Sequence, residues 1–418
     1  MPTKRHEITT MKRKRAEKTG VYLPGLNGLR FFAAILVVLG HVELLKEYHG
    51  YSNIYSHPAV YELGRMGVTF FFVLSGFLIT YLLLTEKKVV GSISIRKFYI
   101  RRILRIWPLY FLLVLLSFFI LPRIGFFNIP TLSSNLPVYF NYTLPLFLLF
   151  LPQLALSIFP PVPYAEPLWS IGVEEQFYLM WPLLLKRFRR FLALAIGIVV
   201  AGYLIKQLAF MIASQSTDAT AIKYWNYFIN FFYFTRIECM AIGAIGAWCV
   251  FKRKGAILKL VYHKATQIVV YALVAYSLMT GANKPVYNYS LYSILFCLVI
   301  LNVATNPHSL LKVESRLFIF LGNISYSIYM FHEIAIKIAI NTLAKLFSTT
   351  FNGIASNIGL YAFTIILTLI IASLSYLLFE TKFLRLKYKF SIIRSGSDVK
   401  REENKLISTS KATLSTGF

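Results

Sequence analysis

The sequence predicts an all-α, polytopic integral membrane protein with about ten transmembrane helices. Hydrophobic residues make up 57% of the 418-residue chain. Apolar runs of roughly 15 to 25 residues, about the length that crosses a bilayer as a helix, recur from Gly28 to Phe379. Short basic clusters separate these runs, as expected for a chain that crosses the membrane repeatedly.

The formal net charge of +27 therefore follows the positive-inside rule and does not indicate nucleic-acid binding. The basic clusters predict cytoplasmic loops, whereas the loops 46–65 and 122–142 are poor in positive charge and are expected outside. Patches that face anionic lipid would look the same. The clusters lie at residues 1–18, 87–105, 186–190, 252–264, 312–316 and 382–389.

Ten spans with both termini in the cytoplasm satisfy this charge pattern, provided that residues 143–159 do not cross the membrane. Pro145 and Pro152 interrupt that apolar segment, so we expect it to be re-entrant or interfacial. The spans are expected near residues 28–45, 66–85, 107–121, 167–185, 190–212, 231–251, 266–281, 289–304, 317–345 and 357–380.

Three segments organise the chain. Residues 1–21 form a basic leader, expected to be disordered and cytoplasmic, because it lacks the apolar core of a signal peptide. Residues 22–381 form the transmembrane domain, and residues 382–418 form a polar cytoplasmic tail. The three cysteines lie in apolar runs without metal-ligand spacing, so no metal site is expected.

Arg30 and His41 are two ionisable residues in the first expected span, roughly 16 Å apart along a helix. Ionisable groups inside a span are costly and usually functional. For either residue alone, the alternative is a snorkelling arginine or a histidine that bonds to a neighbouring helix.

A second group is the sequence RRILRIWP, Arg101 to Pro108. On a helix, Arg102 and Arg105 are neighbours at i, i+3, and their forked guanidinium groups suit phosphate oxygens. Ordinary cytoplasmic charge explains why the cluster exists, but not why three arginines reach so close to the apolar boundary.

Glu174 and Glu175 lie within the apolar sequence of residues 166–182. At least one of these carboxylates must face a polar interior, because lipid does not tolerate it. Measured from the cytoplasmic face, His41 would lie roughly 20 Å deep. Measured from the outer face, Glu174 would lie roughly 10 Å deep. In a hydrocarbon core of about 30 Å these depths coincide, which permits contact between the two side chains.

A fourth group of polar residues occupies 321–333 and includes Tyr326, Tyr329 and His332. Single polar residues of this kind also serve as hydrogen bonds between helices, which is the alternative here. Arg236 and Glu238 in the sixth expected span could form a local structural pair.

Together these groups resemble the membrane acyltransferase-3 family of glycan O-acyltransferases. The resemblance runs from about Tyr22 to Glu380. Each motif alone is loose, but five in the correct order form a specific signal. The motifs are Arg30 and His41 with ten residues between them, FFVLSGFL at Phe71–Leu78, the Arg101, Arg102, Arg105 and Pro108 motif, LWSI through Pro182 with Ile171 where leucine is usual, and Ser325, Tyr326, Tyr329 and His332.

The resemblance implies an O-acyltransferase that moves an acyl group, usually acetyl, from acyl-CoA to a hydroxyl of a cell-surface carbohydrate or glycolipid. It implies acyl-CoA as co-substrate without a permanently bound cofactor, and a place in the bacterial cytoplasmic (inner) membrane. Some members carry an extracytoplasmic SGNH esterase-like domain. We expect the stand-alone form here, because only a short polar tail follows the membrane domain.

The resemblance also implies roles for individual residues. His41 is the expected central catalytic residue, and Glu174 is expected to orient it or to balance its charge. Arg30, Arg101, Arg102 and Arg105 are expected to bind acyl-CoA, and the residues expected to line the substrate site are Ser75, Trp169, Tyr178, Tyr326 and His332. A transporter or flippase for a lipid-linked sugar is the alternative, because buried charge and ten spans would fit it as well.

Overall fold

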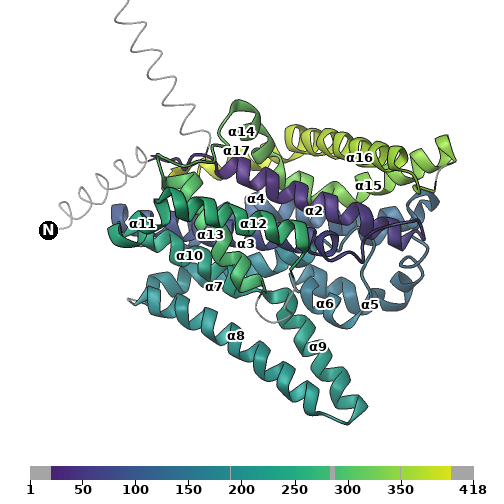
Figure 1. Cartoon of the computed structure of the whole chain (residues 1–418), viewed down its shortest axis with the longest axis horizontal. Coiled ribbons are helices and arrows are strands. Elements are labelled where there is room, and N and C mark those ends of the chain that lie inside the picture. The colour runs from purple at the N-terminus through teal and green to yellow at the C-terminus, as the bar shows by residue number, and fades with distance from the viewer. Residues whose placement is uncertain (1–19, 189, 283–287, 349, 397–418) are drawn as a thin grey trace, which may run out of the picture.

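The computed structural model describes residues 20–188, 190–282, 288–348 and 350–396. Nearly all of the expected leader and the tail from residue 397 onward lie outside these described residues. The described chain is a helical bundle, as expected, and its only strands are the two-residue segments β1 (Gly20–Val21) and β2 (Arg394–Ser395), which pair in parallel (Figure 1). The helices are α2 (Leu26–Tyr48), α3 (Pro58–Val90), α4 (Ile95–Leu115), α5 (Asn135–Leu148), α6 (Pro152–Ile158), α7 (Leu168–Arg187), α8 (Phe191–Gln215), α9 (Ala219–Thr235), α10 (Ile237–Phe251), α11 (Gly255–Tyr262), α12 (Lys264–Thr280), α13 (Asn288–Thr305), α14 (Arg316–Asn323), α15 (Ser325–Phe347), α16 (Ile354–Ser375) and α17 (Thr381–Tyr388).

Several of these helices are long and apolar enough to cross a membrane, which makes the chain a multi-pass membrane protein. By length and composition, the described residues contain six such helices, or seven if α11 and α12, which meet at a 64° bend, form one broken span. Helices α7 and α15 are not among them, because charged and polar residues interrupt their apolar sequences. These are the two helices that carry Glu174 and His332.

The helix boundaries differ from the expected spans at four places. Helix α3 extends over 33 residues and begins well before the expected span 66–85. Helix α4 begins at Ile95, so the arginine cluster is part of a helix. The expected spans at 231–251 and 317–345 are each divided into two helices, at Arg236 and at Ile324.

The segment 143–159 contains the end of α5 and the whole of α6, which have 14 and 7 residues. At 1.5 Å per residue, these helices are about 21 and 11 Å long, so neither crosses a core of about 30 Å alone. Pro145 lies inside α5, and Pro152 is the first residue of α6. The structure agrees with the expectation that this segment does not form a single continuous span.

The helices differ in what they contact. In Figure 1, α15 and α16 lie along one long edge of the bundle, and α8 and α9 form a hairpin that projects from the opposite edge. Only Phe191, Ala195 and Ala209 of α8 are buried, which suits a helix that faces lipid. By contrast, α2, α3 and α10 are mostly buried and form the centre of the bundle.

The crossing of α3 and α10 depends on glycine. A Cβ atom on Gly76 would lie 1.9 Å from the Met240 carbonyl oxygen, and one on Gly243 would lie 2.1 Å from the Val73 carbonyl oxygen. Only residues without a side chain allow the two backbones to approach this closely. The neighbouring Ser75 points about 100° away from Gly76 around α3 and lines an internal pocket.

We therefore expect Gly76→Ala to destabilise the protein, because the added methyl group forces the helices apart. Overpacking of this kind costs about 1–3 kcal/mol. Thermal unfolding of the purified protein in detergent provides the measurement. Gly197→Ala on α8 is the matched control, because nothing lies within 4 Å of a Cβ at that position. A melting temperature of Gly76→Ala equal to that of the control variant would contradict this interpretation of the crossing.

Candidate functional site

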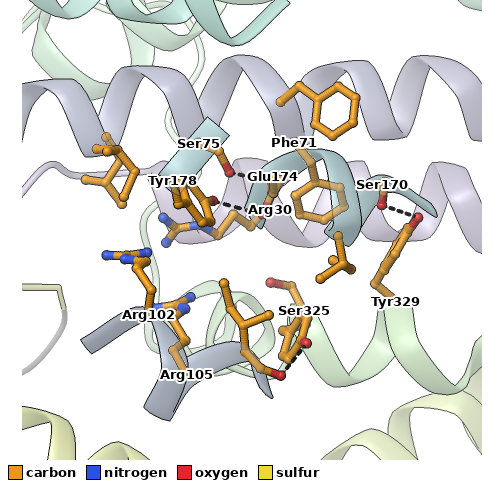
Figure 2. A pocket seen from close by; sticks show the side chains of 16 residues that line it. Arg30, Phe71, Ser75, Arg102, Arg105, Ser170, Glu174, Tyr178, Ser325 and Tyr329 are labelled. Carbon is orange, nitrogen blue, oxygen red and sulfur yellow. Dashed lines mark hydrogen bonds between the residues drawn. The ribbon is translucent and has the colours of Figure 1, made fainter. Parts of the chain in front are cut away.

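A pocket opens between α2, α3, α4, α7 and α15 (Figure 2). It contains about 740 Å³ of empty space, including the part open to solvent. We call it the arginine pocket, because Arg30, Arg102 and Arg105 line it. Figure 2 shows these three side chains gathered toward one end of the pocket.

The charges of the three arginines are not neutralised by ion pairs. Among the described residues, no carboxylate oxygen lies within 4.0 Å of a guanidinium nitrogen of these three arginines. Arg30 donates to the Asn27 side-chain oxygen at 3.3 Å, and the buried Nε of Arg102 has no hydrogen-bond partner. The pocket therefore offers forked donors and positive charge to an anion.

Arg101 lies apart from this group, because successive residues of a helix point about 100° apart. Its side chain pairs with Glu86 at 3.5 Å and donates to the Phe390 carbonyl oxygen at 2.9 Å. It lines a smaller neighbouring cavity together with Arg102.

Glu174 also lines the arginine pocket, beside Arg30 (Figure 2). Its carboxylate accepts hydrogen bonds from Ser75 Oγ at 2.6 Å and from the Tyr178 hydroxyl at 2.8 Å (Figure 2). Glu174 and Tyr178 share a helix face at i, i+4. Glu175 lies on a different face of α7, where it accepts a hydrogen bond from Trp107 Nε1 at 3.0 Å. Of the two adjacent carboxylates, Glu174 is the one that lines the pocket.

His41 lines a second pocket, which we call the histidine pocket. It contains about 510 Å³ of empty space, including the part open to solvent. Three turns of α2 separate His41 from Arg30, so the two side chains lie on nearly the same face of the helix. The residues around the histidine pocket include Tyr55, Tyr61, Arg65, Glu166, Trp169, Phe234, Arg236 and Tyr329.

The protonation of the His41 ring follows from its hydrogen bond. Nδ1 lies 2.8 Å from the Val37 carbonyl oxygen, which can only accept, so Nδ1 carries the proton and Nε2 is left with a lone pair. His332 packs edge-on against this ring at a centroid distance of 4.7 Å. Its Nδ1 likewise lies 2.6 Å from the Tyr329 carbonyl oxygen, and its Nε2 has no partner.

His41, His332 and Glu333 form the one cluster of potential metal ligands found among the described residues. One ligand atom from each lies within 4.8 Å of the others. Two imidazoles whose other nitrogen bonds to a carbonyl group, with a carboxylate beside them, could ligate a divalent cation. The cysteines are buried and lie outside this cluster.

Tyr329 lines both pockets. Its hydroxyl bonds to Ser170 Oγ at 2.7 Å (Figure 2) and donates to the Pro167 carbonyl oxygen at 3.0 Å. Tyr326, which was also expected to line the site, lies in the arginine pocket and donates to the Ile106 carbonyl oxygen at 3.0 Å. Trp169 lines the histidine pocket.

The structure places Glu174 and His41 in different pockets, although the sequence permits contact between them. A depth estimate fixes the level of a residue in the membrane but not the direction in which its side chain points. The acidic residue that shares the pocket with His41 is Glu166, which sequence analysis did not select. Its place directly before an apolar run was the only signal available.

Sequence analysis also missed the two arginines of the histidine pocket. Arg65 was assigned to a loop, but it lies in α3 because that helix begins at Pro58. Arg236 and Glu238 were considered as a local pair, which is wrong, because Glu238 pairs with Lys206 of α8. Arg236 instead turns into the histidine pocket.

Comparison with known proteins places this arrangement in a family. The family described as an acyltransferase domain matches residues 23–377. A provisionally named O-acetyltransferase of Staphylococcus aureus strain COL is 27% identical over 379 residues, covering 87% of this chain and 57% of that protein. The O-acetyltransferase OatA of Staphylococcus aureus strain NCTC 8325 is 27% identical over 406 residues, covering 88% of this chain and 58% of that protein.

The chain thus spans somewhat less than three fifths of the length of these curated relatives. No solved structure matches it. The family match covers most of the chain, including both pockets and all five motifs identified in the sequence. The chain belongs to the acyltransferase-3 family of membrane proteins.

Proposed function

We propose that this protein transfers an acetyl group from acetyl-CoA to a hydroxyl group of a cell-surface carbohydrate or glycolipid. The observation that carries the proposal is the pair of pockets that share Tyr329. One pocket offers three arginines that form no ion pair within the described part of the chain, and the other offers an imidazole nitrogen with a free lone pair. A phosphate-bearing donor and a hydroxyl-bearing acceptor require these two environments.

The proposed donor binds in the arginine pocket. CoA carries a diphosphate and a 3′-phosphate, and the guanidinium groups of Arg30, Arg102 and Arg105 would bind them by forked hydrogen bonds. The acyl end would extend toward Tyr329 and the histidine pocket. Glu174 would hold Ser75 and Tyr178 in place and balance the arginine charge, so we assign it to the donor side.

His41 Nε2 would remove the proton from the acceptor hydroxyl as its oxygen attacks the thioester carbonyl. The tetrahedral intermediate then collapses, the carbon–sulfur bond breaks, and the leaving thiolate takes the proton from the imidazolium. The products are an ester and free CoA. The same nitrogen could instead carry the acyl group briefly before the hydroxyl attacks.

We further propose the ten-span topology with both termini in the cytoplasm, in the bacterial inner membrane. This orientation would place the arginine pocket toward the cytoplasm, where acetyl-CoA is made, and the histidine pocket deeper, toward the outer face. The acceptor would then approach from outside.

The topology predicts which exposed loop residues an impermeant maleimide reaches in intact cells. Ser134→Cys and Thr217→Cys should be labelled, whereas Ser92→Cys should react only after permeabilisation. The three native cysteines are buried, so the unmodified protein is the control. Labelling of Ser134→Cys only after permeabilisation would refute the proposed orientation.

The His41→Ala variant should lose about two to four orders of magnitude in acetyl transfer, because a positioned general base contributes that much. Transfer of radiolabelled acetyl groups by purified protein is the measurement. His57→Ala, at an exposed position before α3, is the matched control and should retain activity. If His41→Ala retained near-normal acetyl transfer and His332→Ala lost it, His332 and not His41 would be the general base.

Replacing Arg102 and Arg105 together by Lys should raise the KM for acetyl-CoA about tenfold or more, because lysine cannot make forked contacts. The wild-type protein should also prefer acetyl-CoA over its 3′-dephospho analogue, and the double variant should show less of this preference. Arg187→Lys at the exposed end of α7 is the control. An unchanged KM for acetyl-CoA and an unchanged preference over the 3′-dephospho analogue would contradict phosphate binding by these arginines. The cluster would then serve only as cytoplasmic positive charge that sets the topology.

A further inference from the structure

The histidine pocket contains two arginines that the proposed mechanism does not use, Arg65 and Arg236. Arg236 occupies the break between α9 and α10 and is only 1% exposed. A buried guanidinium group is costly unless its charge and its N–H groups are matched. The partners of these two side chains therefore indicate what the pocket is built to bind.

The hydrogen bonds of Arg236 are incomplete. Its Nε donates to the Tyr233 carbonyl oxygen at 2.8 Å, and its Nη1 donates to Thr69 Oγ1 at 3.2 Å and to the Arg65 carbonyl oxygen at 3.4 Å. Its buried Nη2 has no acceptor. The Tyr289 ring lies 3.5 Å from Cζ, so the guanidinium plane is fixed by an aromatic face rather than by a carboxylate.

Arg65 places a second positive charge beside His41. A Cβ atom on the adjacent Gly64 would lie 3.2 Å from His41 Cε1, so α3 passes close to the imidazole at this point. Arg65 stacks on the Tyr61 ring at 3.4 Å and donates to the Tyr61 carbonyl oxygen at 2.6 Å. Within the part of the chain that the structure describes, neither Arg65 nor Arg236 forms an ion pair.

Two acidic residues, Glu166 and Glu62, lie near these arginines. Glu166 lines the same pocket from the loop before α7. Burial raises the pKa of Glu166, and Arg65 opposes that shift. Glu62 does not line the pocket, but it accepts a hydrogen bond from Tyr289 at 3.4 Å and interacts electrostatically with Arg65 and Arg236. Neither carboxylate accepts a hydrogen bond from the buried Nη2 of Arg236.

The remaining walls are aromatic and include Tyr55, Tyr61, Trp169 and Phe234. Flat aromatic faces pack against the C–H faces of sugar rings and leave the ring hydroxyls free to reach polar groups. A pocket that combines such faces with two unpaired arginines and a basic imidazole suits an anionic sugar better than a neutral one.

We propose that the acceptor carries a carboxylate or a phosphate group close to the hydroxyl that is acylated, and that Arg65 and Arg236 bind this group. The inference rests on the proposed function only in taking the histidine pocket as the acceptor side. The anion would complete the hydrogen bonds of Arg236 and would set the distance between the reacting hydroxyl and His41.

Equilibrium binding to the purified full chain in lipid nanodiscs tests this proposal without requiring turnover. Three probes are titrated by calorimetry: methyl β-glucuronide, glucose 1-phosphate and the neutral methyl β-glucoside. We expect at least one anionic sugar to bind about tenfold more tightly than the neutral sugar, which is about 1.4 kcal/mol. The stronger of the two anions identifies whether the pocket selects a carboxylate or a phosphate.

Arg236→Gln and Arg65→Gln should each abolish this preference. Arg123→Gln, an exposed arginine outside both pockets, is the matched control. If burial makes Arg236→Gln unfold, the half-buried Arg65→Gln decides the outcome. Equal binding of the anionic and neutral sugars by the wild-type protein, or a preference that persists in Arg65→Gln, would overturn the proposal.

Acetyl transfer assays on the same samples separate this inference from the proposed function. Arginine-dependent binding of an anionic sugar without any acetyl transfer would contradict the enzymatic proposal but support the anion-binding site. Transfer to neutral and anionic sugars with equal efficiency, together with equal binding, would support the enzyme and contradict the anion site.

Discussion

Charge burial is the constraint on which the rest of this structure depends. A bundle in lipid has no water with which to solvate arginines, glutamates and histidines, so each must find partners among the helices or face an internal cavity. Lys46 forms an ion pair with Glu43, and Lys206 forms one with Glu238. Arg30, Arg102 and Arg105 instead gather around a pocket and form no ion pair with any residue that the structure describes, which is a costly arrangement unless a ligand supplies the anion.

The close crossing of α3 and α10 lies at the centre of the bundle. Because Gly76 and Gly243 remove the side chains at the contact, the two helices approach within backbone distance and form a rigid centre. The helices α2, α4, α7 and α15 then contribute polar side chains to the spaces beside it. Tyr329 contacts both spaces, so an acyl group passing from one to the other would move along its hydroxyl.

The helical class could be predicted from the apolar runs, and the family from five motifs in the correct order. The i, i+3 spacing also placed Arg102 and Arg105 on one helix face, and both line the arginine pocket, whereas Arg101 lies apart. Contacts between distant helices could not be predicted. The pairing of His41 with His332 joins α2 and α15, and the broken helix at Arg236 was read as a continuous span. Glu174 points to Ser75 and Tyr178, since hydropathy does not specify how a helix is rotated.

The central claim is that a CoA thioester enters through the arginine pocket and reaches His41 past Tyr329. An electron cryo-microscopy structure of the full chain with a non-hydrolysable acetyl-CoA analogue tests it most directly. The phosphates should lie within hydrogen-bonding distance of Arg30, Arg102 and Arg105, with the acyl carbonyl carbon near His41 Nε2. Phosphates bound instead to Arg65 and Arg236, with the arginine pocket empty, would contradict the claim.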